Sequence, residues 1–113
     1  MTAYAYSAWY PLAWSRDIGH GITTRRVLEE ELAVYRTPDG TVAALEDACP
    51  HRLAPLSIGR LQGDAIQCGY HGLAFDCTGR CVHAPGMARV PDSFRVGSFP
   101  TAGSMGMLWV WMR

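Results

Sequence analysis

Short runs of aliphatic, aromatic and β-branched residues recur along the chain, and residues typical of turns separate them. Runs of this length, ending in glycine, proline or aspartate, are typical of β-strands joined by tight turns. Turn signals of this kind occur at Thr37–Gly40, Gln62–Asp64 and Cys77–Gly79. We expect strands at Trp9–Trp14, Leu32–Arg36, Thr41–Leu45, Ala65–Gln67, Leu73–Phe75, Arg80–His83 and Met107–Met112. The pattern therefore predicts an all-β fold made of antiparallel sheets.

The segment at residues 24–36 is ambiguous. Its three glutamates favour helix, and apolar side chains fall at helical spacing at Leu28, Leu32 and Tyr35. The run Leu32–Arg36 nevertheless fits the alternation of a strand equally well. We interpret the segment as two short strands joined by a turn near Glu29–Glu31.

Composition limits the class of protein. A chain of 113 residues with 49% hydrophobic and 18% charged residues predicts a single globular domain over residues 1–113. Ten basic and ten acidic residues balance, so no charge excess points to nucleic acid or to an anionic membrane surface. The sequence contains no long apolar run and no signal-peptide pattern, which predicts a cytoplasmic protein.

Two short motifs carry the candidate chemistry. Cys49-Pro-His51-Arg and Cys68-Gly-Tyr-His71-Gly each supply one thiolate and one imidazole, and 16 residues separate His51 from Cys68. Two histidines in place of two of four cysteines are typical of a Rieske-type [2Fe–2S] centre. A zinc site with the same four ligands is the alternative, although zinc motifs more often pair like ligands. The motifs thus predict a [2Fe–2S] cluster held by two loops, in a protein that accepts one electron and passes it on.

The other cysteines and histidines have simpler interpretations. Cys77 and Cys81 could form a hairpin disulfide or a second metal pair, but two ordinary thiols suit a reducing cytosol better. His83 begins a His-Ala-Pro-Gly segment that could form a third loop over the cluster, and it is not needed as a ligand. His20, between two glycines, is expected to lie in a loop.

The motifs and their flanking segments resemble the Rieske domain of aromatic-ring hydroxylating oxygenases, in particular vanillate O-demethylase and related oxygenase components. The segments that carry the resemblance are Ala8–Leu12, Leu45–Ser57, Cys68–Asp76 and Gly79–His83. The resemblance implies a Rieske fold with a two-loop cluster-binding subdomain. It also implies that Cys49 and Cys68 bind one iron, and that His51 and His71 bind the other, more exposed iron.

The resemblance further implies partners. In this family a reductase or ferredoxin supplies electrons from NADH. A mononuclear iron in a second domain, commonly in a neighbouring subunit of a homotrimer, receives them and oxidises an aromatic substrate. No two-histidine, one-carboxylate triad can be assembled from His20 and His83, so we expect the catalytic iron domain to be absent from these residues. The alternative is a stand-alone Rieske-type ferredoxin.

Overall fold

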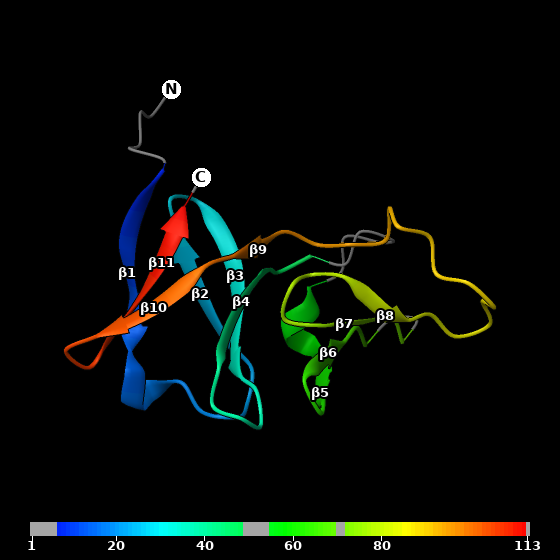
Figure 1. Cartoon of the computed structure of the whole chain (residues 1–113), viewed down its shortest axis with the longest axis horizontal. Coiled ribbons are helices and arrows are strands. Elements are labelled where there is room, and N and C mark those ends of the chain that lie inside the picture. Colours follow the sequence, from blue (N-terminus) through cyan, green and yellow to red (C-terminus); the bar gives the residue numbers. More distant parts are fainter. Residues whose placement is uncertain (1–6, 49–54, 70–71, 113) are drawn as a thin grey trace.

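The computed structural model describes residues 7–48, 55–69 and 72–112. Within these ranges the chain forms eleven β-strands and two 3-10 turns (Figure 1). In chain order they are β1 (Ala8–Trp14), η1 (Ser15–Asp17), β2 (Thr23–Val27), β3 (Glu30–Arg36), β4 (Val42–Glu46), η2 (Leu56–Ile58), β5 (Arg60–Gln62), β6 (Ala65–Gln67), β7 (Ala74–Phe75), β8 (Cys81–His83), β9 (Ser98–Phe99), β10 (Thr101–Ser104) and β11 (Met107–Met112). The prediction of an all-β fold is confirmed.

All pairs of neighbouring strands are antiparallel in the three sheets that the described residues form. The strand orders are β1-β11-β10, β2-β3-β4-β9 and β5-β6-β7-β8. The sheet β2-β3-β4-β9, called the middle sheet below, packs against each of the other two sheets. Figure 1 shows β5–β8 and the preceding 3-10 turn as a separate lobe beside the other two sheets.

The interpretation of residues 24–36 as two strands is confirmed. Strands β2 and β3 pair from Thr23 with Val34 to Val27 with Glu30. The two residues between them, Leu28 and Glu29, have positive φ angles of 50° and 68°. Two consecutive left-handed residues form the tight turn whose twist matches a hairpin. The turn lies slightly earlier than expected.

Strand β3 of the middle sheet is buried on both faces over residues 32–35, which explains why it resembled a helix in the sequence. Leu32 and Val34 pack into one core cluster, with residues of β1 and β11. Ala33 and Tyr35 point the opposite way into a second cluster, with residues of β6 and β7. A strand covered on both sides has apolar residues at successive positions, so it loses the alternation that marks a half-exposed strand.

The second core cluster joins the small lobe to the rest of the molecule. Tyr35 of β3 is fully buried in it, and its hydroxyl donates a hydrogen bond of 2.9 Å to the backbone carbonyl of Asp64, in the β5–β6 turn. Phe75 and Ile66 of the lobe pack on the same cluster. The lobe is therefore held in place from β3. In the chain, the first ligand motif precedes η2 of the lobe, and Cys68 of the second motif directly follows β6.

Candidate metal centre

Cys68 begins the second ligand loop, directly after β6. Its backbone N–H donates to the carbonyl of Leu73 at 2.7 Å, and its own carbonyl accepts from the N–H of Gly72 at 3.1 Å. These two bonds close a short loop between β6 and β7. Gly72 has a φ of 77°, a left-handed conformation that glycine adopts at little cost. A backbone hydrogen bond thus joins Cys68, at the start of the pattern Cys-Gly-x-x-Gly, to Gly72 at its end.

The first ligand motif lies between β4 and η2, and the residues that flank it close its base. The Asp47 carboxylate accepts two hydrogen bonds of 2.7 Å, one from the backbone N–H of Ser57 and one from the Ser57 hydroxyl. Hydrogen bonds to an ionised acceptor are about twice as strong as neutral ones. Asp47 precedes Cys49 by two residues, so this pair fixes both ends of the first loop.

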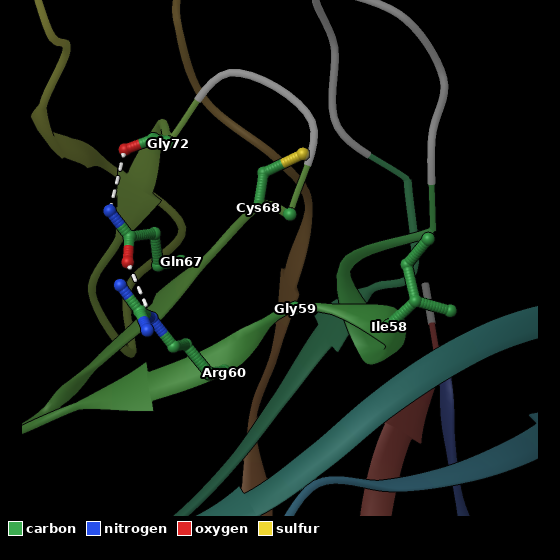
Figure 2. Close-up of a pocket in the computed structure, with 7 residues that line it drawn as sticks. Ile58, Gly59, Arg60, Gln67, Cys68 and Gly72 are labelled. Atoms are coloured by element: carbon green, nitrogen blue, oxygen red, sulfur yellow. Dashed lines mark hydrogen bonds between the residues drawn. The ribbon is translucent and has the colours of Figure 1, made fainter.

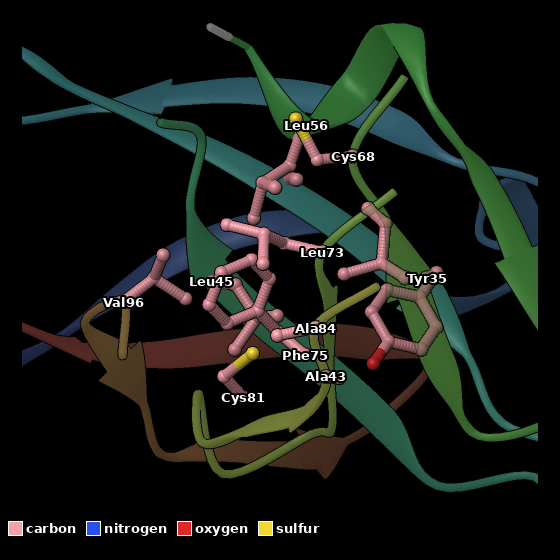
Figure 3. Packing of buried hydrophobic residues seen from close by; sticks show 12 residues of the cluster. Tyr35, Ala43, Leu45, Leu56, Cys68, Leu73, Phe75, Cys81, Ala84 and Val96 are labelled. Carbon is pink, nitrogen blue, oxygen red and sulfur yellow. The ribbon is translucent and has the colours of Figure 1, made fainter. Parts of the chain in front are cut away.

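The flanks of the two loops are in direct contact. Gly59 follows η2, and a methyl group placed on it would lie 1.8 Å from the carbonyl oxygen of Gln67 and 3.2 Å from the backbone nitrogen of Gly69. The two backbones therefore touch where the first loop ends and the second begins. Figure 3 shows Leu56 beside Cys68 at one end of the second core cluster, to which both side chains belong.

Of the four predicted ligands, Cys68 is the one that the structure describes; Cys49, His51 and His71 lie outside the described residues. Cys68 is 2% exposed and carries a free thiol. A buried cysteine sulfur beside the contact between the loop flanks fits one position of the donor set that a [2Fe–2S] cluster requires. Among the described residues no group of three metal-binding side chains is present, since three of the predicted ligands lie outside them.

Comparison with known families decides the nature of this domain. A family described as "Rieske [2Fe-2S] domain" matches residues 8–100, which is most of the chain. This chain is a Rieske [2Fe–2S] domain. Its cofactor is a Rieske-type [2Fe–2S] cluster, and the zinc alternative is set aside.

Several relatives of this Rieske domain are oxygenase components. The oxygenase component of chloroacetanilide N-alkylformylase from Rhizorhabdus wittichii is 47% identical over 110 residues, which cover 96% of this chain and 31% of the relative. A vanillate O-demethylase oxygenase subunit from Pseudomonas is 39% identical, covering 93% of this chain and 29% of the relative. The crystal structure of dicamba monooxygenase bound to dicamba superposes with a TM-score of 0.95 at 43% identity, over 99% of this chain and 34% of that one. The Rieske domain thus spans about a third of the length of these relatives.

The remaining cysteines and histidines of the Rieske domain are not brought together. Cys77 and Cys81 are free thiols, as expected; Cys77 is exposed, whereas Cys81 is 4% exposed within the second core cluster. His20 lies in an exposed loop, with Nδ1 3.2 Å from the Arg36 carbonyl oxygen. His83 ends β8 and is exposed. The segment after it does reach the second ligand loop, since Pro85 packs against Gly72.

Thiol reactivity should separate the two non-ligand cysteines. Burial raises the pKa of the Cys81 thiol, so less of the reactive thiolate is present at neutral pH. Its Sγ also donates to the His83 carbonyl oxygen at 3.4 Å. We expect iodoacetamide to alkylate Cys77 at least about tenfold faster than Cys81, as measured by peptide mass mapping. Equal rates in the native protein would contradict this, while equal rates in urea serve as the control.

Loss of the Asp47 carboxylate should loosen the base of the first loop. Asp47→Ala removes two charge-assisted hydrogen bonds to Ser57, and we expect it to lower the free energy of unfolding by about 2 kcal/mol. Urea unfolding followed by tryptophan fluorescence measures the change. Asp92→Ala, at an exposed aspartate in the loop after β8, is the matched control and should cost about 0.5 kcal/mol or less. Equal losses for the two variants would show that the Asp47–Ser57 pair has no special role.

Sequence reasoning missed the residues that support the two loops. Asp47, Ser57, Gly59 and Gln67 all lie within two residues of the β4, η2 or β6 ends that flank the motifs. None is a metal-ligand type in a recognised spacing, so no sequence motif marks them. A usable signal was present for two of them, because Asp47 lies two residues before the first motif, Ser57 lies five residues after it, and both residue types suit a loop-closing hydrogen bond.

Proposed function

We propose that Cys49, His51, Cys68 and His71 hold the cluster, and that this chain is the electron-transfer domain of a non-haem iron oxygenase component. The observation that carries the proposal is the contact between the loop flanks at Gly59, with the buried Cys68 thiol beside it. Two loops that start from touching backbones can direct their side chains toward one shared site. The mixed thiolate and imidazole pairs are the donor set that a Rieske centre requires.

The residues of this chain would then act either as ligands of the cluster or as supports of the two loops. Cys49 and Cys68 would bind one iron as thiolates, and His51 and His71 would bind the other through neutral imidazoles. When bound, a cluster with this ligand set supplies one-electron redox chemistry at a potential above that of an all-cysteine cluster. Asp47 and Ser57 would hold the first loop closed, and Gly59 would allow the second loop to approach it.

We further propose the partners of the longer protein. Its electron donor would be an NADH-dependent reductase or a ferredoxin, and its acceptor a mononuclear iron in a second domain, in a neighbouring subunit of a homotrimer. The substrate class would be aromatic compounds that are hydroxylated or O-demethylated, and the site of action the cytoplasm. In support, the relatives named above are oxygenase components of which this chain spans about a third. No helix of the described residues is long and apolar enough to cross a membrane.

An aromatic face supports the presence of a partner domain. Trp9 and Trp14 of β1 are 45% and 47% exposed, and the Trp9 ring meets Trp111 of β11 edge-on at 5.4 Å between centroids. Exposed patches of large apolar side chains mark interaction surfaces. We propose that another domain of the longer protein covers this face. Binding of a hydrophobic dye by the 113-residue chain, lost in a Trp9→Ser/Trp14→Ser variant and absent from the longer protein, would agree; equal binding by the longer protein would not.

The stand-alone ferredoxin remains the alternative function, and the coding sequence distinguishes the two. An in-frame two-histidine, one-carboxylate triad downstream of codon 113 would support the oxygenase component. A stop codon at that point would favour the carrier. The relatives named above favour the oxygenase component, because each of them is an oxygenase protein of about three times this length.

Spectroscopy of the anaerobically purified chain tests the proposed site. We expect a coloured protein that gives a low-temperature EPR signal after one-electron reduction by dithionite, and we expect nitrogen hyperfine coupling from two imidazoles in that signal. A colourless, EPR-silent protein would contradict the cluster assignment. A signal with coupling from fewer than two imidazoles would contradict the assignment of His51 and His71.

A further inference from the structure

Gln67, the last residue of β6, lies between two groups with opposite hydrogen-bonding needs. Its side-chain Nε2 donates to the carbonyl oxygen of Gly72 at 3.2 Å, and its Oε1 accepts from Nε of Arg60 on β5 at 3.1 Å (Figure 2). A carbonyl can only accept and a guanidinium can only donate. The amide orientation is therefore fixed by its partners, and an amide is the group of this size that satisfies both.

The group that Gln67 holds belongs to the second ligand loop. Gly72 directly follows His71 in the chain, and its N–H is already bound to the Cys68 carbonyl at 3.1 Å. With the Gln67 contact, both polar backbone groups of Gly72 have a partner, one from the loop itself and one from β6. Pro85 and Gln67 also pack around the position that a Gly72 side chain would occupy, at 3.2 and 3.4 Å. The backbone on the C-terminal side of His71 is thereby fixed.

Gln67 is itself held on both sides. Its backbone carbonyl lies against Gly59, so closely that a methyl group there would be 1.8 Å away. Its side chain is held by Arg60, the next residue after Gly59. Gln67 thus connects the end of η2, beyond the first motif, to the loop of the second motif. These residues also line a depression of about 360 Å³ that reaches Cys68.

We propose that Gln67 is a positioning residue that sets the orientation of His71 through Gly72, with Arg60 fixing the Gln67 amide. This inference rests on the proposed function, since it takes His71 to be a cluster ligand. A histidine ligand whose neighbouring backbone is not held by hydrogen bonds could rotate relative to the iron. The orientation of a ligand tunes the electronic structure of its metal. Gln67 would act on this ligand from outside the metal shell, through its hydrogen bond to the neighbouring Gly72.

The test compares four variants of the cluster-loaded chain. Gln67→Glu keeps the size and the Arg60 contact but sets a carboxylate oxygen against the Gly72 carbonyl, and Gln67→Met removes both contacts. Arg60→Met leaves the Gly72 contact and removes its support. Gln62→Met is the matched control, because the other glutamine of the chain makes only a 3.5 Å contact with Gln67.

We expect both Gln67 variants to raise amide hydrogen exchange at residues 68–73 by about tenfold, the factor for losing one hydrogen bond. We also expect broader EPR lines from the reduced cluster and a shifted midpoint potential of the cluster. Arg60→Met should show a smaller change of the same kind, and Gln62→Met no change.

Two outcomes would overturn the inference. One is exchange, EPR line shape and midpoint potential in the Gln67 variants equal to those of Gln62→Met. The other is faster exchange with an unchanged EPR signal and potential, which would make Gln67 a structural residue of the loop and not a positioning residue for the cluster. Failure of the proposed function looks different, because the unaltered chain would then carry no Rieske signal at all.

Discussion

Replacing Cys68 by serine is expected to abolish the cluster. Serine has nearly the size of cysteine but offers a hydroxyl of very high pKa in place of a thiolate, and the thiolate is the metal ligand. Cys68 is 2% exposed at the closed base of the second loop, so no other described cysteine can take its position without rebuilding that loop. Visible absorption and EPR after dithionite should both fall to the level of the protein without cluster.

The other two described cysteines provide the controls. Cys77→Ser changes an exposed residue in the β7–β8 turn, and Cys81→Ala changes a residue of the same core cluster as Cys68. In Figure 3 Cys81 lies at the end of the cluster opposite Cys68. Both variants should keep full cluster content. A Cys68→Ser protein with the normal signal, or loss of the signal in Cys77→Ser, would contradict the ligand assignment.

Much of the fold could be predicted because its hairpins are local. The pair β3–β4, with its Thr37–Gly40 turn, and the closing strand β11 were expected at nearly the observed positions. Turn residues fix both partners of a hairpin, so the sequence alone contains the pairing. The β2–β3 turn was harder, because Leu28 and Glu29 adopt left-handed conformations there that glycine or asparagine would normally mark.

Strands β9 and β10 were missed for a different reason. Ser98–Phe99 makes only two register pairs with β4, and Thr101–Ser104 is mostly exposed and contains a glycine. Strands this short or this polar have no hydrophobic pattern of their own, and their partners decide their conformation. The side of the middle sheet that faces the small lobe could not be predicted either, since both faces of β3 are apolar.

In the candidate site, too, some residues have a signal in the sequence and others depend on their partners in the fold. Candidate ligands stand out in the sequence because a metal centre needs particular side chains at particular spacings, and their assignment stays a prediction. The supporting residues could not be predicted, because Gly59, Gln67 and Asp47 act through backbone contacts and hydrogen bonds that exist only once the segments flanking the motifs have folded together. Each of these residues has at least one other residue of the same type in the chain, so residue type alone does not identify it.

Adding a methyl group at Gly59 should be the most damaging small substitution near the site. In Gly59→Ala the new Cβ would lie 1.8 Å from the Gln67 carbonyl oxygen and 2.9 Å from its carbon, both of them backbone atoms. Backbone in a paired strand cannot move aside as a flexible side chain can, so η2 and β6 must separate. Overpacking of this kind costs about 3 kcal/mol, and we expect that loss in the free energy of unfolding.

The same separation should release the cluster. The contact at Gly59 is where the flanks of the two ligand loops meet, so pushing them apart moves Cys68 away from the first motif. We expect the Gly59→Ala protein to hold less than about a tenth of the normal cluster, measured by iron content and visible absorption, because a separation of even 1 Å is large on the scale of a metal–ligand bond.

Gly21→Ala is the matched control, since a methyl group at Gly21 would meet nothing within 4 Å and its φ is not left-handed. That variant should keep its cluster and unfold within about 0.5 kcal/mol of the unaltered protein. A Gly59→Ala protein that is equally stable and equally loaded would contradict the proposal that the close backbone approach at Gly59 is needed to hold the cluster.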